Sequence, residues 1–246
     1  GQYVYNFNRC LFMPATFTGG MEYNRDALKD NMWGYGRELE QTVHISSLFL
    51  QNEWKNDQWS FLVGGRFDKH NLIDGLIFSP RANVRFNPSE NINFRASYSA
   101  GFRAPQAFDE DLHIEAVGGG VSMIELASDL QEEKSHSFSL SADLYQRWGD
   151  FQGNLLVEGF YTTLNDVFAL REKNHENGIL TLERHNASGA NVYGVTMEGK
   201  LAYQNKLQLQ AGATLQKSEY KEPEQWSETA KAEKRIARTP EAYGYF

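Results

Sequence analysis

Regular alternation of apolar and polar residues is the feature of this sequence that most constrains its fold. Across residues 92–102, apolar side chains occupy every second position, while Asn, Arg, Ser and Gly fill the positions between them. Successive side chains of a β-strand point to opposite faces, so such a segment forms a strand with one apolar and one polar face. The same register recurs at residues 81–86, 137–145 and 207–215. Helical periodicity is weak throughout, and the sequence therefore predicts an all-β fold.

The connectors between these strands alternate in length. Short turns rich in Asn, Asp, Gly or Pro are predicted at residues 55–58, 87–91, 148–150 and 204–206. Longer connectors are predicted at residues 25–41, 69–77, 103–134, 171–180 and 221–238. This alternation places all short turns at one end of the sheet and all long connectors at the other, as in a transmembrane barrel.

Composition narrows the possible classes. The net charge of −8 over 246 residues argues against nucleic acid as a partner, because phosphate binding needs clustered Lys and Arg. No apolar run reaches the length of about 18 residues that a membrane-spanning helix needs. Cys10 is the only cysteine, and the histidines lack a metal-binding spacing. We therefore expect no metal site and no cofactor.

Strand length and aromatic placement also favour a barrel that spans a membrane. Residues 151–170 and 181–203 contain few breakers and are predicted as long, uninterrupted strands. Aromatic residues cluster near predicted strand ends, as in interfacial girdles. These aromatic residues are Trp54, Trp59, Phe86, Trp148, Phe151 and Tyr203.

Several short motifs occur in order along the sequence. They are Gln51-Asn52-Glu53-Trp54, Gly65-Arg66-Phe67-Asp68, Ser79-Pro80-Arg81, Tyr-Ser-Ala-Gly-Phe-Arg-Ala-Pro at residues 98–105, and Asn186 with Gly189 and Gly194-Val195. Together these motifs resemble the C-terminal barrel of TonB-dependent outer-membrane receptors. The most specific of them is residues 98–105, which is similar to a strand end that opens a long external loop in that family. The sequence departs from the family pattern at Glu110 and Leu112, and at Thr196, where the family usually has Glu.

The resemblance implies an architecture and a role. Residues 1–246 would be antiparallel, up-and-down strands of a transmembrane β-barrel, about half of a barrel of about 22 strands. The plug domain and the remaining strands would lie outside this sequence. The family takes up scarce ligands such as a ferric siderophore, haem or cobalamin through the bacterial outer membrane. The TonB complex energises this uptake by acting on the plug.

Candidate site residues fall into two groups. Arg103 and the acidic stretch Asp109, Glu110, Asp111 with His113 lie in a predicted external loop and are candidates for ligand binding. A solvated loop that contacts neighbouring outer-membrane lipid is the competing interpretation. The second group lies on predicted polar strand faces, where its members would face the lumen and contact the plug. It consists of Arg81, Arg85, Arg95 and Glu198.

Two alternatives stay open at this point. A complete small outer-membrane barrel with hydrolase activity would gather Asp109, Asp111, His113 and His185 at its outer rim. A β-rich extracellular binding domain would need no membrane. No nucleophile elbow, catalytic triad order or carboxylate pair is recognisable. The resemblance to the receptor family implies a receptor and not an enzyme.

Overall fold

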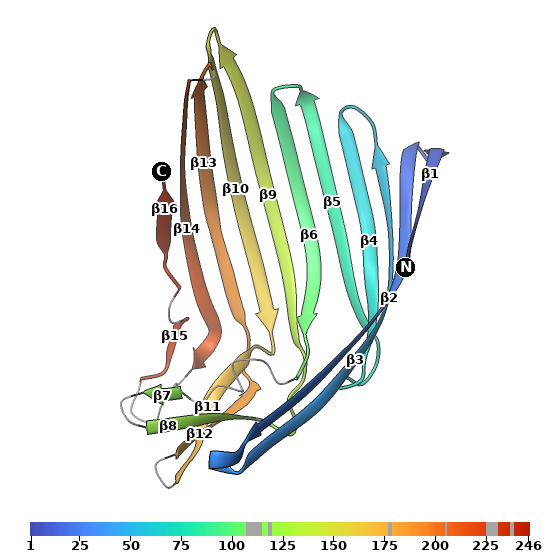
Figure 1. Ribbon diagram of the computed structural model, residues 1–246. Coiled ribbons are helices and arrows are strands. Elements are labelled where there is room, and N and C mark those ends of the chain that lie inside the picture. The colour runs from blue at the N-terminus through green and yellow to red at the C-terminus, as the bar shows by residue number, and fades with distance from the viewer. Residues whose placement is uncertain (107–114, 118–119, 177–178, 205, 225–230, 237–238) are drawn as a thin grey trace.

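A single large antiparallel sheet dominates the computed structural model (Figure 1). The structure describes residues 1–106, 115–117, 120–176, 179–204, 206–224, 231–236 and 239–246. Within these ranges the large sheet has 12 strands, in the order β1-β2-β3-β4-β5-β6-β9-β10-β13-β14-β15, with β16 also pairing with β14. The sheet is an open, curved wall, and the described residues of β1 do not pair with its other edge.

Most strands of this sheet are long, as the alternating sequence pattern predicts. Their bounds are β1 Gln2–Cys10, β2 Met13–Met32, β3 Arg37–Lys55, β4 Trp59–His70, β5 Ile77–Ser89, β6 Ile92–Arg103, β9 Glu133–Trp148, β10 Phe151–Asn165, β13 Ala190–Tyr203, β14 Leu207–Glu224, β15 Glu233–Arg235 and β16 Ala242–Tyr245. The helix η1 spans Trp33–Tyr35. Among the described residues, no helix has the length and apolar character needed to cross a membrane.

The short turns all lie at one end of the sheet, as predicted (Figure 1). They comprise residues 11–12, 56–58, 90–91 and 149–150, and the connection between β13 and β14 that includes Gln204 and Lys206. The longer connectors lie at the opposite end. Every neighbouring pair of strands in the large sheet is antiparallel, so the chain runs up and down between these two ends.

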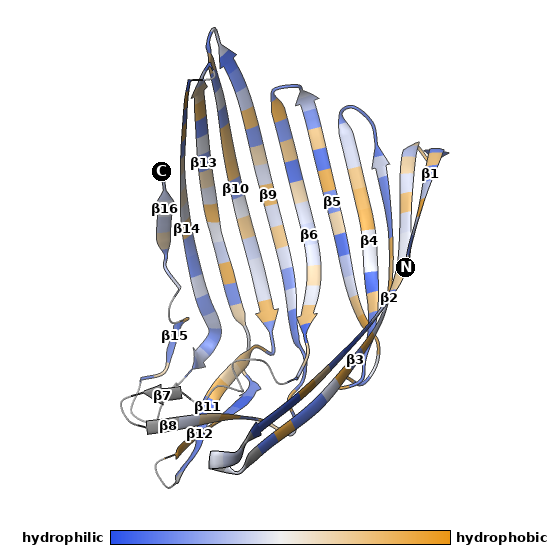
Figure 2. Cartoon of the chain, viewed as in Figure 1, coloured by the Kyte–Doolittle hydropathy of each residue, from blue (hydrophilic) through white to orange (hydrophobic). Residues whose placement is uncertain are grey.

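The two faces of the sheet differ in chemistry. Apolar and polar bands alternate along the strands in Figure 2, and the cross-strand register aligns these bands between neighbours. Leu140 is 64% exposed and Val63 is 56% exposed on the apolar face. On the polar face Ser141 is only 7% exposed, because polar side chains crowd together on that side of the curved sheet. This distribution inverts that of a water-soluble protein, in which large apolar side chains are buried.

A second sheet lies at the end with the long connectors. It has four strands in the order β11-β12-β8-β7, with bounds Phe168–Glu176, Ile179–Asn186, Gly120–Leu126 and Glu115–Val117. Strands β8 and β12 pair in parallel, although they belong to different connectors. The small sheet therefore joins the connector after β6 to the connector after β10. The prediction of residues 103–134 as a long connector was therefore wrong at β7 and β8.

Two further predictions about strand extent need correction. Residues 151–170 and 181–203 are not uninterrupted strands, because the chain breaks at Asp166, with φ 54°, and at Gly189, with φ 124°. These breaks turn β11 and β12 out of the large sheet. Residues 25–41 are mostly not a loop, because β2 and β3 continue their hairpin up to η1. These residues are mostly polar and show no regular apolar alternation, so the sequence pattern did not predict strands here.

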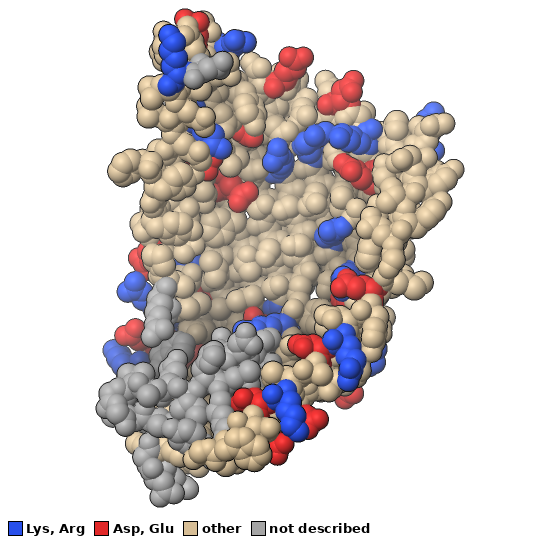
Figure 3. All heavy atoms as spheres, viewed as in Figure 1, with Lys and Arg blue, Asp and Glu red and all other residues tan. Residues whose placement is uncertain are grey.

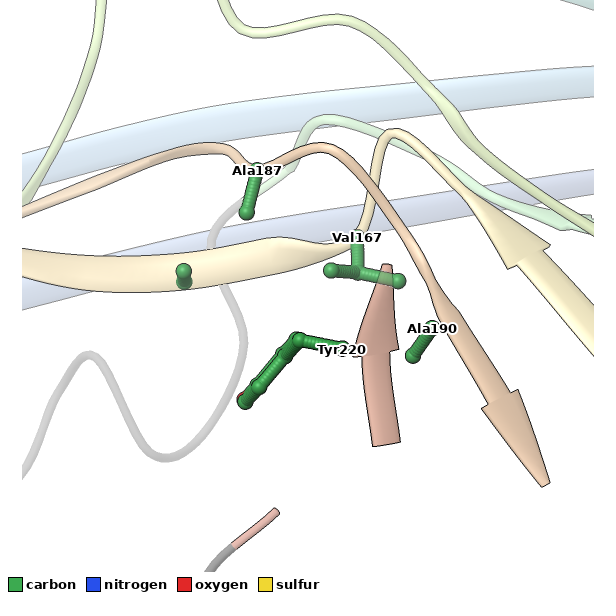
Figure 4. Packing of buried hydrophobic residues seen from close by; sticks show 5 residues of the cluster. Val167, Ala187, Ala190 and Tyr220 are labelled. Atoms are coloured by element: carbon green, nitrogen blue, oxygen red, sulfur yellow. The ribbon is translucent and has the colours of Figure 1, made fainter. Parts of the chain in front are cut away.

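Buried apolar residues form only small clusters, both at the end with the long connectors. One contains Val167, Ala169, Ala187, Ala190 and Tyr220 (Figure 4). The other contains Ile73, Ile77 and Ala104, with Phe102 packed against it. These clusters fix the points at which the long connectors leave the large sheet.

Candidate functional site

The Gly-Phe-Arg-Ala-Pro motif, residues 101–105, lies at the end of β6, where the connector that contains β7 and β8 begins. Phe102 packs against the cluster of Ile73, Ile77 and Ala104. The guanidinium carbon of Arg103 lies over the ring of Phe168, 5.4 Å from its centroid. A guanidinium over an aromatic face is attracted by the ring quadrupole. The motif therefore anchors the connector after β6 to the start of β11, and Arg103 is part of this anchor.

The other predicted ligand-binding residues cannot be placed. Asp109, Glu110, Asp111 and His113 lie in residues 107–114, outside the described residues. Their assignment to ligand binding stays a prediction.

The Asn-x-x-Gly motif at residues 186–189 has a clear structural reason. The Asn186 side-chain NH2 donates to the backbone oxygens of Gln131, at 3.0 Å, and Asp166, at 2.7 Å. Its oxygen accepts a hydrogen bond of 2.8 Å from the backbone N–H of Gln131. Gly189 then adopts φ 124°, and a Cβ at this position would overlap the carbonyl oxygen of Leu164. Asn186 thus ties two long connectors together, and Gly189 returns the chain to the large sheet.

Ion pairs cover one side of the small sheet. Arg171 pairs with Glu183 at 2.5 Å, and Lys173 pairs with Glu125 at 2.9 Å and with Glu183 at 3.6 Å. The hydrogen bond from Arg171 lowers the pKa of Glu183. The hydrogen bond to Glu125 raises the pKa of Lys173. These pairs link β11, β12 and β8, and so strengthen the connection between the two long connectors.

A buried polar network lies on the polar face of β2, β3 and β4. Asp68 is 2% exposed and accepts hydrogen bonds from the Ser47 hydroxyl at 2.5 Å and from Arg66 Nε at 2.8 Å. Arg66 also donates to Glu22 at 3.0 Å and to the Ser47 hydroxyl at 2.7 Å. The carboxylate is thus paired with a cation as well as hydrogen-bonded, as a buried charge requires. The Gly-x-Arg-x-Asp motif at residues 65–68 is recognisable in the sequence, but its role in this buried network was not predicted.

Fully buried His70 continues this network toward the long connectors. The backbone N–H of Leu72 donates to His70 Nδ1 at 3.0 Å, so this nitrogen is the acceptor. His70 Nε2 lies 3.4 Å from the side-chain oxygen of Gln106, which begins the connector after β6. This second contact links the end of β4 to the connector after β6. The isolated histidine offered no sequence pattern from which the contact could be predicted.

The predicted lumen-facing arginines share the polar face of β5 and β6. Arg85 and Arg95 lie directly opposite each other, and Arg81 lies opposite Ser99. Arg81 hydrogen-bonds to Gln51. In the described part of the chain none of these arginines forms an ion pair, and Arg85 Nε is buried without a hydrogen bond. Figure 3 shows basic side chains in a band across the sheet, on the side of the short turns.

Glu198 shares the polar face but not this environment. Lys200 pairs with it at 2.8 Å, and the Tyr245 hydroxyl donates to its second carboxylate oxygen. Its charge is therefore compensated within the sheet, whereas the charges of Arg81, Arg85 and Arg95 are not. In the regions that the structure describes, no three His, Cys, Asp or Glu side chains are placed to share a metal ion.

Comparison with known proteins decides the family. The family model described as "TonB dependent receptor-like, beta-barrel" matches residues 2–246. The chain belongs to this family. The family consists of barrels of the bacterial outer membrane, so the complete small barrel with hydrolase activity and the extracellular binding domain are set aside. No curated protein sequence matches the chain.

Solved structures with the same fold are siderophore receptors and iron transporters. The siderophore receptor PirA from Pseudomonas aeruginosa has a TM-score of 0.74 and 17% identity, covering 88% of this chain and 41% of that one. The FrpB iron transporter from Neisseria meningitidis has a TM-score of 0.62 and 16% identity, covering 89% and 36%. A mutant of the ferric enterobactin receptor PfeA from P. aeruginosa has a TM-score of 0.63 and 17% identity, covering 87% and 34%.

These matches fix the architecture. The chain spans less than half the length of the receptors it matches. An open sheet of antiparallel strands, apolar on one face and polar on the other, is consistent with about half of such a barrel.

Proposed function

We propose that this chain is about half of the barrel of an outer-membrane receptor that takes up a ferric siderophore, with energy supplied by the TonB complex through a plug domain. The observation that carries the proposal is the family match over residues 2–246, together with structural neighbours that are siderophore receptors and iron transporters. In this proposal the end with the long connectors faces outward and captures the ligand. Haem and cobalamin are the alternative ligands.

The geometry of the long connectors supports ligand capture at that end. The parallel pairing of β8 with β12 and the contact of Arg103 with Phe168 couple two connectors. A ligand that displaces one connector would therefore move the other. We propose that Arg103, Asp109, Glu110, Asp111 and His113 line or flank this ligand site.

The arginines of β5 and β6 support a second contact. A like-charged pair directly opposite, such as Arg85 and Arg95, is unfavourable unless an anion lies nearby. We propose that carboxylates of the plug supply that anion for Arg81, Arg85 and Arg95. Glu198, on the same face of the sheet, would also contact the plug. Outer-membrane lipid would contact the apolar face.

A growth experiment tests the ligand. The gene for the full receptor, read upstream and downstream of this chain, is expected to encode a signal peptide, a plug and the remaining strands. The gene is introduced into a bacterial mutant that lacks its own outer-membrane iron receptors, and the iron-starved cells are supplied with a ferric catecholate, a ferric hydroxamate or haem. The gene is also introduced into a strain that needs cobalamin for growth, and that strain is supplied with cobalamin. The proposal predicts growth rescue by a ferric siderophore only when TonB is present. Rescue by haem or cobalamin alone would contradict it.

A further inference from the structure

The apolar face of the sheet carries a groove directly beside a row of aromatic rings. Tyr98, Phe138, Tyr161 and Tyr193 lie in register across β6, β9, β10 and β13. The groove has a volume of about 700 Å³ and runs from this row toward the short turns. Its volume falls within the range of about 300–1,000 Å³ that is usual for small-molecule sites.

The groove exists because small and large side chains alternate along the next register row. In that row Ala96, Leu140, Gly159 and Val195 lie side by side. Leu140 and Val195 stand out from the sheet, whereas Gly159 leaves a hollow between them and Ala96 leaves a second hollow on the far side of Leu140. A Cβ added at Gly159 would have no heavy atom within 4 Å. The hollow is therefore open to the outside of the sheet.

The aromatic row separates this hollow from a polar zone nearer the long connectors. The Tyr98 hydroxyl hydrogen-bonds to His136 Nδ1 at 2.9 Å, and the Tyr161 hydroxyl donates to the Asn191 side-chain oxygen at 3.0 Å. Tyr98 lies opposite Phe138, and His136 is two residues nearer the long connectors than Phe138. Tyr161 lies opposite Tyr193, and Asn191 is two residues nearer the long connectors than Tyr193. The hydroxyls thus point toward the polar zone, which is the orientation of tyrosines at a membrane interface.

We propose that this groove binds one membrane lipid, with a hydrocarbon chain between Leu140 and Val195 and the polar headgroup against His136 and Asn191. The face belongs to an outer-membrane receptor barrel, so lipid is the solvent that surrounds it. The strands that line the groove are paired on both sides and offer no free edge to a peptide. The groove is bordered by the aromatic row, and the hydrogen-bonding side chains of His136 and Asn191 follow beyond that row, an order that matches the amphipathic structure of a lipid. The proposal is independent of which ligand the receptor transports.

A photolabelling experiment tests the proposal. The full-length receptor is placed in nanodiscs that contain phosphatidylglycerol with a diazirine in one acyl chain, illuminated, and mapped by mass spectrometry. The proposal predicts that adducts concentrate at the groove. Gly159→Leu fills the hollow and is expected to reduce these adducts about tenfold, which corresponds to about 1.4 kcal/mol.

The chain offers a matched control. Gly199 also lies on the apolar face, outside the groove, and a Cβ there would also have no heavy atom within 4 Å. Gly199→Leu is therefore expected to leave labelling of the groove unchanged. Val195→Phe narrows the same hollow from the neighbouring strand β13 and must reproduce the loss, which guards against a folding defect confined to Gly159→Leu.

Other results would overturn the proposal. Adducts spread evenly over the apolar face, and equal in wild type, Gly159→Leu and Val195→Phe, would mean that lipid contacts the groove without a defined site. A receptor dimer detected by cross-linking across β9 and β10, with no lipid adducts in the groove, would mean that a second copy covers it.

Discussion

The two ends of the molecule are stabilised in different ways. Between the short turns and mid-sheet, each of the strands β4 to β13 is held by backbone hydrogen bonds to both neighbours, with one register shift between Phe86 and Ser89 of β5. At the other end, a few side chains join connectors from different parts of the chain, among them Asn186 and Arg103. Substitutions in the regular part should therefore act through the face they occupy, whereas substitutions at the other end should act through the particular contact they remove.

The largest effect is expected from a charge in the middle of the apolar face. Leu140→Arg would place a guanidinium in the hydrocarbon layer and should destabilise the barrel by about 2–4 kcal/mol. Ser139→Arg changes the adjacent residue, which lies on the polar face, and should cost much less. Unfolding of the full receptor in lipid vesicles by guanidinium chloride measures both. Equal losses for the two variants would contradict the assignment of faces.

A smaller but sharply local effect is expected at the break between β12 and β13. Gly189→Ala imposes a side chain at φ 124° and against the Leu164 carbonyl, at a cost of about 1–3 kcal/mol. Gly199→Ala, in an open position, is the control and should be nearly neutral. The thermal unfolding midpoint of the receptor measures the difference. A neutral Gly189→Ala variant would show that the chain does not need this backbone conformation.

The next effect should be confined to the long connectors. Asn186→Ala removes hydrogen bonds to Gln131 and Asp166, each of which contributes about 0.5–1.5 kcal/mol. Hydrogen exchange is expected to accelerate in β8, β11 and β12, with little change in β9 and β10. Asn191→Ala, which removes one contact to Tyr161, is the control. Faster exchange throughout the large sheet would contradict the separation of the two ends.

The smallest effect concerns pH. The pKa of Glu183 is lowered in the folded state, so its contribution to stability is present above the ordinary glutamate pKa and is lost as the pH falls through the lowered value. Exchange in β11 and β12 should therefore rise slightly in acid. Glu183→Gln should show faster exchange at neutral pH and lose this acid-induced increase. An unchanged acid response in Glu183→Gln would assign the effect to other groups.

The regular part of the fold was predictable from sequence because period-two alternation and connector length report directly on strands and turns. In β5, β6, β9 and β14, alternation within each segment predicted which residues lie on the apolar face, and the structure confirms this assignment. The extension of β2 and β3 was not predictable, because residues 25–41 are mostly polar and lack a regular apolar alternation. Strands β7 and β8 were missed because their pairing joins connectors that are distant in sequence.

The candidate site shows the same division. The positions of Arg81, Arg85, Arg95 and Glu198 on one face follow from strand parity alone, and the structure places them there. The contact of Arg103 with Phe168 depends on how two connectors meet, which no local pattern encodes. Likewise, the network around the buried carboxylate of Asp68 combines residues from three strands, which no single segment of sequence reveals.

The most direct test of the central claim measures which face of β9 meets lipid. Nitroxide labels are placed singly at residues 137–144 of the full receptor in vesicles, and their accessibility to oxygen and to a water-soluble nickel chelate is recorded. The account predicts strict alternation, with oxygen favoured at Phe138, Leu140, Ala142 and Leu144 and not at the residues between them. Uniform accessibility along the strand, or oxygen favoured at the serines, would contradict it.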